Sequence, residues 1–215
     1  SRARYSNPSL IWVNDGKSDP TFTSRVAGNG GVKFYEMNAG MCFLDLDHDG
    51  YQDLWHGQIS YEQLGAGATR RSRLYLNEAG KRFNDITWDA GMSHHGPWTG
   101  VRIDFDRDGD LDLLASSGTE SVKLYRNDVD KKGASITLLL RNTKDNTLPR
   151  DGSGAHVTVV AGASRFHRWT VATPVGGRAA QMSTDLHVGL GDVTVVDSVI
   201  VRWPNGERQI VTSLP

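Results

Sequence analysis

The stretch Asp45–Trp55, DLDHDGYQDLW, decides the fold, because it returns as DFDRDGDLDLL at Asp104–Leu114. In both copies four aspartates fall at positions 1, 3, 5 and 9 of a nine-residue loop, with a glycine at position 6. Each loop then leads into an apolar segment. Like charges at this density repel one another, so the pattern calls for a compensating partner.

Hard oxygen ligands at alternate positions around a glycine turn suit Ca²⁺, which takes six to eight oxygens. Position 7 offers a backbone carbonyl. The loop differs from an EF-hand, because His56 and Ala115 stand at position 12, where an EF-hand carries a bidentate Glu. The bidentate ligand is therefore expected at position 9. The predicted ligands of two Ca²⁺ ions are Asp45, Asp47, Asp49, the carbonyl of Tyr51 and Asp53 for the first, and Asp104, Asp106, Asp108, the carbonyl of Asp110 and Asp112 for the second.

An alternative reading of these loops needs no metal. Aspartate caps turns by accepting a hydrogen bond from its own backbone, so aspartate-rich turns also occur without an ion. Two copies with identical spacing, at matching places of a repeat, favour the metal-binding reading. A divalent cation would turn the repulsion into a cross-link where little apolar surface is available for burial.

The acidic loops belong to a longer repeated pattern. An aromatic–x–Asn string occurs at Ile11–Asn14 (IWVN), Leu74–Asn77 (LYLN) and Leu124–Asn127 (LYRN). The order is strand, turn, strand, loop, acidic turn and strand. Short strands with Gly and Asn turns in tandem are typical of propeller blades. No segment has a 3.6-residue apolar period, so an all-β chain is expected, with about two propeller-blade-like units in residues 1–130.

Residues 131–215 are predicted to form a separate, β-sandwich-like domain after a polar linker. Asn205–Gly206 supplies the turn of a predicted hairpin. The predicted strands lie in ASITLLL, AHVTVVAG, SRFHRWTVAT, TDLHVGLG, DSVIVRW and RQIVTS. Alternation with polar positions predicts core side chains at Ile136, Leu138, Val157, Val159, Trp169, Val171, Leu186, Val188, Val199, Val201 and Trp203.

Composition narrows the functional classes. The formal net charge is -1, which gives no electrostatic case for nucleic acid or a charged membrane surface as partner. No apolar run approaches the roughly 20 residues of a membrane span. The single cysteine, Cys42, excludes an internal disulfide and is expected to be a core thiol rather than a reactive one. The chain starts at Ser1 rather than Met, which indicates a mature or trimmed form.

The chain resembles two known families. LYLNEAGKRFNDITWDAGM and GVRIDFDRDGDLDLLASSG resemble the FG-GAP or VCBS-type repeat, the calcium-binding blade of integrin-like β-propellers. IWVNDG and CFLDLDHDGYQDLWHG resemble it less cleanly. The C-terminal part resembles the UnbV/ASPIC domain that follows such repeats in relatives of cartilage acidic protein. That likeness rests on RDGSGAHVTV, AQMS, LHVGLG and VIVRWPNGERQ.

The resemblance implies an extracellular, cell-surface or periplasmic calcium-binding protein that serves adhesion or the binding of protein or glycan. Alternative functions are a structural subunit of an extracellular assembly or filament, and an enzyme or enzyme accessory with an unrecognised site. Related propellers carry about seven blades. Two blades leave faces uncovered. The C-terminal domain, further blades or other chains could cover them, and we expect the last two. The uncovered faces are expected near Trp12, Phe34, Trp55 and Trp98.

Other candidate residues are read as structural. His94 and His95 are expected to be a solvated loop pair rather than metal ligands. Ser183, Asp185 and His187 lie close together in sequence, but alternate residues of one strand share a face, which is the wrong geometry for a proton relay. No catalytic residue and no organic cofactor is predicted, and the chain is not expected to be an enzyme.

Overall fold

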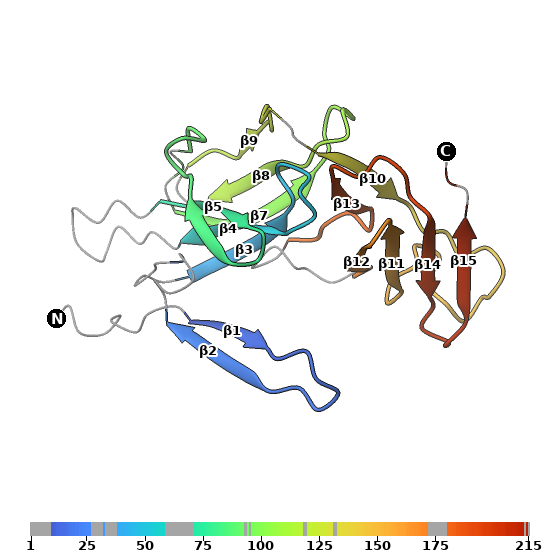
Figure 1. The fold of residues 1–215 in the computed structure, drawn as a ribbon. Coiled ribbons are helices and arrows are strands. Elements are labelled where there is room, and N and C mark those ends of the chain that lie inside the picture. Colours follow the sequence, from blue (N-terminus) through green and yellow to red (C-terminus); the bar gives the residue numbers. More distant parts are fainter. Residues whose placement is uncertain are drawn as a thin grey trace.

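The computed structural model describes residues 10–26, 32, 38–58, 71–92, 94, 96–117, 120–130, 133–171, 180–212 and 214. These residues form strands and turns without a helix, which confirms the expected all-β class. The described segments accordingly hold no helix of the length and apolarity that crossing a bilayer requires. Within these residues the strands form five antiparallel sheets, and none of the sheets closes into a barrel (Figure 1).

The first region supplies a hairpin and two larger sheets. In Figure 1 the hairpin, β1–β2, projects away from the two larger sheets. One of these has the strand order β3-β4-β5-β6 and the other has the order β7-β8-β9. The strands are β1 (Leu10–Asn14), β2 (Phe22–Val26), β3 (Asn38–Leu44), β4 (Asp53–Gln58), β5 (Arg73–Glu78), β6 (Arg82–Asp85), β7 (Pro97–Ile103), β8 (Asp112–Ser117) and β9 (Lys123–Tyr125).

The predicted repeat is visible in the order of these strands. An acidic loop joins β3 to β4, and the other joins β7 to β8. The aromatic–x–Asn strings form β5 and β9, each beside the strand that follows the acidic loop. β6 completes the first sheet, whereas β9 has no further strand beside it among the described residues. The two sheets therefore share the order of strand, acidic loop, strand and aromatic–x–Asn strand, and they do not form a ring.

Trp55 of β4 fills the space between the two sheets. Its side chain is fully buried, and a Cβ at Gly100 of β7 would overlap the indole ring. A Cβ at Gly57 would lie 2.8 Å from the same ring. The prediction that Trp55 faces an uncovered surface is therefore wrong. β7 covers the indole ring, and the missing side chain of Gly100 leaves space for it. Of the other three, Trp12 is exposed, Trp98 is half-buried and Phe34 lies outside the described residues.

The close approach of β7 to Trp55 predicts a stability effect. We expect Gly100→Ala to lower the free energy of unfolding by about 1–3 kcal/mol, because the added methyl group overpacks a filled interface. Thermal melts of the purified protein measure this. Trp55→Leu introduced into the Gly100→Ala variant should cost less than it does in the wild type, because the smaller side chain makes room for the methyl group. An unchanged melting temperature for Gly100→Ala would contradict the tight packing.

The C-terminal region packs a two-stranded sheet on a four-stranded sheet. The strand orders are β10-β13 and β12-β11-β14-β15. All six predicted strands are present, and Asn205 and Gly206 form the turn between β14 and β15 as expected. The strands are β10 (Ala134–Leu138), β11 (His156–Ala161), β12 (Ser164–Trp169), β13 (Leu186–Gly191), β14 (Ser198–Arg202) and β15 (Arg208–Thr212).

Most of the predicted core of this region is confirmed. Val157, Val159, Leu186, Val188, Val199 and Val201 are buried, and Ile136, Leu138 and Trp203 pack partly buried against them. The prediction that Trp169 and Val171 belong to the core is wrong, because their side chains are 63% and 45% exposed. The inward positions of β12 are Phe166 and Arg168 instead. The inward and outward faces of β12 are therefore the opposite of those predicted, because the polar residue Arg168 points inward.

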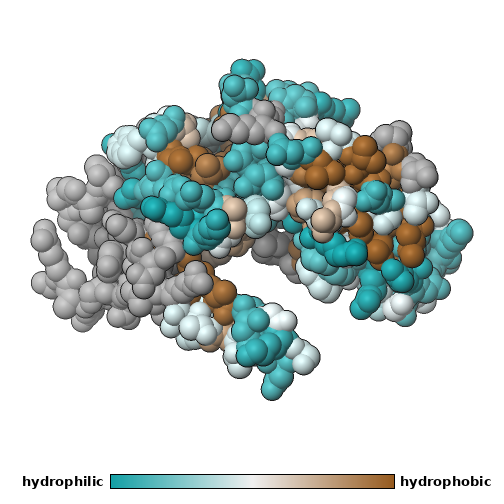
Figure 2. All heavy atoms as spheres, in the orientation of Figure 1, coloured by the Kyte–Doolittle hydropathy of each residue, from teal (hydrophilic) through white to brown (hydrophobic). Residues whose placement is uncertain are grey.

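The two sheets differ in width, and this leaves one side of the C-terminal core open. Two strands cannot cover four, so Leu138 of β10 and Val199 and Val211 of β14 and β15 line an open hollow. Figure 2 shows hydrophobic residues gathered over the side of the molecule where Figure 1 places β10, β14 and β15.

Candidate metal centre

The two acidic loops have the same backbone conformation. Position 4 has a positive φ in both, 61° at His48 and 62° at Arg107. Position 6 has φ 91° at Gly50 and 94° at Gly109. A left-handed conformation is uncommon for a residue other than glycine, so its recurrence at the same position shows that the loops are structural copies. The sequence pattern predicted this equivalence.

The aspartate at position 1 uses only one of its oxygens within the loop. Asp45 Oδ2 accepts a hydrogen bond from the Gly50 N–H (3.1 Å), and Asp104 Oδ2 accepts one from the Gly109 N–H (3.2 Å). The other oxygen, Oδ1, is buried in both residues and has no hydrogen-bond partner. A buried carboxylate oxygen without a partner is costly, so this oxygen of each loop is suited to a donor or a cation.

The carboxylates of positions 1, 3 and 5 converge in each loop. One oxygen from each of Asp45, Asp47 and Asp49 lies within 4.8 Å of the others, and the same holds for Asp104, Asp106 and Asp108. Position 5 also accepts a hydrogen bond from the position-7 N–H, at 2.8 Å in the first loop and 2.9 Å in the second. Three carboxylates around one point are a donor set that fits a hard divalent cation.

The aspartate at position 9 lies outside these groups of three. Asp53 Oδ2 accepts a hydrogen bond from the Leu46 N–H (2.8 Å), and its Oδ1 accepts one from the Asn77 N–H (2.7 Å). The second copy repeats both bonds: Asp112 accepts them from Phe105 (3.1 Å) and Asn127 (2.8 Å). Through these hydrogen bonds, position 9 holds its loop to the asparagine of the aromatic–x–Asn string that follows. Its role as a metal ligand stays a prediction.

The recurring asparagine of the aromatic–x–Asn strings has a role that sequence reasoning missed. Asn77 Nδ2 donates to the Gln52 carbonyl (2.9 Å), within the first repeat. Asn127 Nδ2 donates instead to the Leu46 carbonyl (2.9 Å), and so joins the second repeat to the first loop. The signal was present, since the asparagine follows an aromatic residue by two positions in all three strings.

Burial shifts the pKa values of aspartates in the first loop. It raises the pKa of Asp45 to about 7, with Asp49 adding to the rise and Arg168 opposing it. Burial also raises the pKa of Asp53 to about 8, against the hydrogen bond from the Asn77 backbone. The ionised forms of Asp45 and Asp53 are therefore disfavoured. A bound cation would reverse this, because a charge of opposite sign stabilises the carboxylates as anions.

The first loop lies at the junction with the C-terminal region, which the sequence did not indicate. Asp45 Oδ2 accepts a second hydrogen bond, from the Gly189 N–H of β13 (3.2 Å), and lies 3.8 Å from the Arg168 guanidinium of β12. The Gly191 N–H donates to the His48 carbonyl (2.8 Å). Arg168 also donates to the Gly50 carbonyl (3.3 Å). One carboxylate thus faces a candidate cation site with one oxygen and the C-terminal region with the other.

The second loop differs in exposure. Asp106 and Asp108 are exposed, whereas Asp47 and Asp49 are half-buried. The side chain of Asp110, at position 7, is buried, and its Oδ1 lies 3.5 Å from His48 Nε2 of the first loop. Tyr51, at the same position of the first loop, is exposed. The first loop is therefore built into the molecule, whereas the second borders on solvent.

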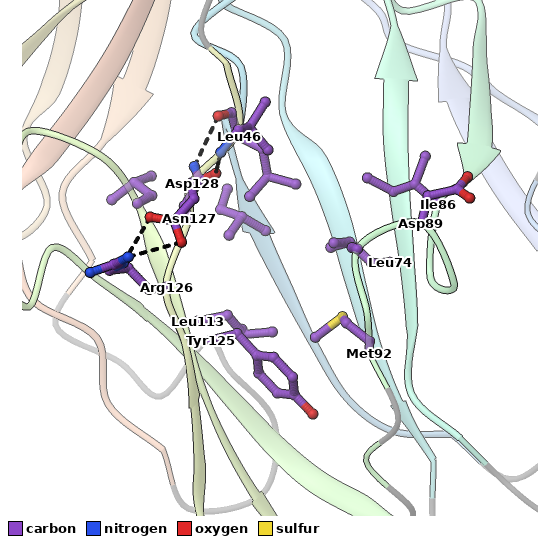
Figure 3. A pocket seen from close by; sticks show the side chains of 14 residues that line it. Leu46, Leu74, Ile86, Asp89, Met92, Leu113, Tyr125, Arg126, Asn127 and Asp128 are labelled. Carbon is purple, nitrogen blue, oxygen red and sulfur yellow. Dashed lines mark hydrogen bonds and ion pairs between the residues drawn. The ribbon is translucent and has the colours of Figure 1, made fainter.

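An apolar cavity of about 340 Å³ separates the two blade-like sheets (Figure 3). Leu74, Met92, Leu113 and Tyr125 are among the side chains that line it. At one end Arg126 pairs with Asp128, at 2.7 Å between Nε and Oδ1. Arg126 and Asp128, which are 56% and 67% exposed, border the cavity where it opens to solvent.

The remaining candidates are corrected or left as predictions. His94 is fully buried rather than solvated, with its Nε2 3.7 Å from Glu120 Oε2, and His95 lies outside the described residues. Cys42 is buried, as expected of a core thiol, and burial raises its pKa to about 11. His187 faces His48, with 4.8 Å between the ring centroids.

Comparison with known proteins bears on the C-terminal region. Residues 143–215 match the family model described as ASPIC and UnbV. The match includes β11 to β15 and confirms this part of the predicted resemblance, although the predicted domain began at residue 131. A search of curated proteins finds no match to the chain. The FG-GAP or VCBS identity of the first region stays a prediction.

Proposed function

We propose that this chain is a calcium-binding module of a non-catalytic extracellular protein that binds or adheres to other molecules. The supporting observation is the pair of loops in which three carboxylates converge beside a buried, unpartnered oxygen, Asp45 Oδ1 in one and Asp104 Oδ1 in the other. A single aspartate-rich turn has a sufficient explanation in its own hydrogen bonds. Two structural copies that each keep such an oxygen are better explained by a ligand.

The proposed ligands form two sets. Asp45, Asp47 and Asp49 would hold one Ca²⁺, and Asp104, Asp106 and Asp108 a second. Asp53 and Asp112 are proposed as further ligands through the lone pairs that their backbone hydrogen bonds leave free. The carbonyls of Tyr51 and Asp110 complete the proposal. The oxygen donors favour calcium over softer metals such as zinc.

The proposed location follows from the same chemistry. Extracellular calcium modules function with dissociation constants of about 10⁻⁴–10⁻³ M, which need the high calcium concentration outside the cell. A loop that borders on solvent at Asp106 and Asp108 fits that range better than the tight, enclosed sites of cytosolic buffers. Extracellular, cell-surface or periplasmic placement therefore accompanies the proposed function.

Metal content gives the direct test. We expect two calcium ions per chain when protein that was never exposed to chelator is measured by native mass spectrometry. Asp106→Asn should reduce the number to one, because it removes a charge from the second group only. Asp130→Asn changes an exposed carboxylate outside both loops and should leave two. A chain without bound calcium in millimolar CaCl₂ would overturn the proposal.

A structural subunit of an extracellular assembly is the second candidate. The hairpin β1–β2 favours it, because Trp12 and Phe22 are 58% and 57% exposed there. Large exposed apolar side chains on a projecting hairpin are typical of contacts between chains. Light scattering with and without calcium separates the two candidates. An assembly of defined size supports the subunit, and a monomer at high protein concentration supports the binding module.

A further inference from the structure

The outer face of the sheet β12-β11-β14-β15 carries an unusual set of side chains. Val157 and Val159 of β11 and Val199 and Val201 of β14 point into the core, so the alternate residues point to the opposite face. The register of the strands places these residues in three rows. The rows are Trp169–His156–Arg202–Arg208, His167–Thr158–Ile200–Ile210 and Arg165–Val160–Ser198–Thr212.

This face has positive charge without compensation. It holds three arginines and two histidines, and none of its twelve positions is Asp or Glu. Arg202 and Arg208 stand directly opposite each other on neighbouring strands, where like charges repel. Among the residues that the structure describes, neither they nor Arg165 forms an ion pair. An anion bound here would relieve the repulsion.

An aromatic surface adjoins the paired arginines. The His156 ring stacks on His167, with 5.3 Å between centroids and 7° between planes. Trp169 leans on the other side of His156, at 4.5 Å between centroids, and is 63% exposed. The row from Trp169 to Arg208 crosses four strands and is about 14 Å long. It therefore has the length for a short extended ligand, with an aromatic platform at one end and two cations at the other.

We propose that this sheet face binds an acidic polysaccharide built of uronic acid units. Arginine pairs with carboxylates through two parallel hydrogen bonds, which suits the Arg202–Arg208 end of the row. The apolar face of a sugar ring stacks on an exposed indole, which suits the Trp169 end. The inference deepens the proposed binding function by naming a partner, and its residues are other than the proposed calcium ligands.

Single-stranded nucleic acid is the competing ligand, because bases also stack on aromatic side chains and phosphates also pair with arginine. One observation favours the glycan. Nucleic acids gain much of their affinity from many phosphate contacts, whereas this face offers three arginines.

The test compares a charged glycan with a neutral glycan of the same linkage and length, and with DNA. A β-1,4-linked glucuronate hexamer and neutral cellohexaose are titrated into the full chain at low salt in millimolar CaCl₂, with a DNA hexanucleotide as third ligand. We expect the glucuronate hexamer to bind at least 10-fold more tightly than either of the others. We also expect its affinity to fall as salt rises. Equal binding of the neutral hexamer, tighter binding of the DNA, or no binding of the glucuronate would overturn the proposal.

Variants locate the site. The double change Arg202→Gln and Arg208→Gln should weaken glucuronate binding at least 10-fold, and Trp169→Ala should weaken it by a similar factor. Arg150→Gln, an exposed arginine of the same region, should leave it unchanged. The double variant relieves a like-charge pair, so its melting temperature should not fall, and lost binding with an intact melt is the supporting result. A double variant that binds as the wild type does would remove the site from this face.

The outcome separates this inference from the proposed function. Calcium content is measured on the same preparations. Two bound calcium ions without glucuronate binding would overturn the glycan site alone. Glucuronate binding by a chain without calcium would overturn the calcium proposal and keep the glycan site.

Discussion

Removal of calcium is expected to lower the melting temperature of this chain by roughly 10 °C or more. A site with a dissociation constant of about 10⁻⁴ M is held at about 100 times that constant in roughly 10 mM CaCl₂, which stabilises the folded state by about 2.7 kcal/mol. Two such sites contribute about 5 kcal/mol, and 1 kcal/mol shifts the melting temperature by about 2–4 °C in chains of this size. Without the ions the converging carboxylates repel one another, and Asp45 Oδ1 and Asp104 Oδ1 stay buried without a partner.

Thermal melts in CaCl₂ and in excess chelator measure this effect. Magnesium should restore little of the lost stability, because it demands a near-ideal octahedral geometry and gives up its water reluctantly. The variant Asp106→Asn should retain part of the calcium dependence, from the first loop. Melting temperatures that coincide with and without chelator would show that both loops are ordinary aspartate turns.

Asp45→Ala is expected to destabilise the protein more than Asp104→Ala, although the two residues hold the same position in equivalent loops. The substitution at Asp45 removes the acceptor for Gly189 and the partner of Arg168, whose side chain is only 14% exposed. Removing one member of a buried charge pair costs about 3–5 kcal/mol. The corresponding loss at Asp104 involves its own loop, through the Gly109 N–H. The difference should appear as a lower melting temperature for Asp45→Ala.

Hydrogen exchange shows where the loss occurs. The amides of β13, Gly189 among them, should lose protection in Asp45→Ala and keep it in Asp104→Ala. Asp45→Asn separates the two roles of the side chain. It retains an oxygen to accept the bond from Gly189 while weakening the attraction for a cation, so its β13 amides should be better protected than those of Asp45→Ala. Equal protection in all three variants would contradict a junction held by Asp45.

Local patterns in the sequence predicted most of the strands and the equivalence of the two loops. Spacing is enough for this, because φ, turn type and strand alternation depend on neighbouring residues, as at Gly50 and Gly109. The alternation failed at β12. Arg168 occupies an inward position because Asp45 and the Gly50 carbonyl receive it, and these lie more than a hundred residues away in the chain. No local pattern carries that information.

In the candidate site, too, the sequence predicted the features that depend on neighbouring residues and missed those that depend on distant ones. The convergence of positions 1, 3 and 5 follows from the loop itself, and the sequence predicted those residues. The hydrogen bonds of Asp53 depend on where β5 lies, since one of them comes from Asn77. The burial of Trp55 depends on β7, which approaches it at Gly100. Both facts arise from the pairing and packing of strands, which the spacing of aspartates does not determine.

The bond between Asp45 and Gly189 also has a consequence for biosynthesis. Gly189 follows Asp45 by 144 positions, and a ribosome adds about 5–20 residues per second. For roughly 7–30 s the nascent first loop exists before its partner strand has been made. During that interval the carboxylates of the loop have only water, protons or an ion to offset their repulsion. During synthesis, whether protons or an ion offset the repulsion in this loop therefore depends on the compartment into which the growing chain emerges.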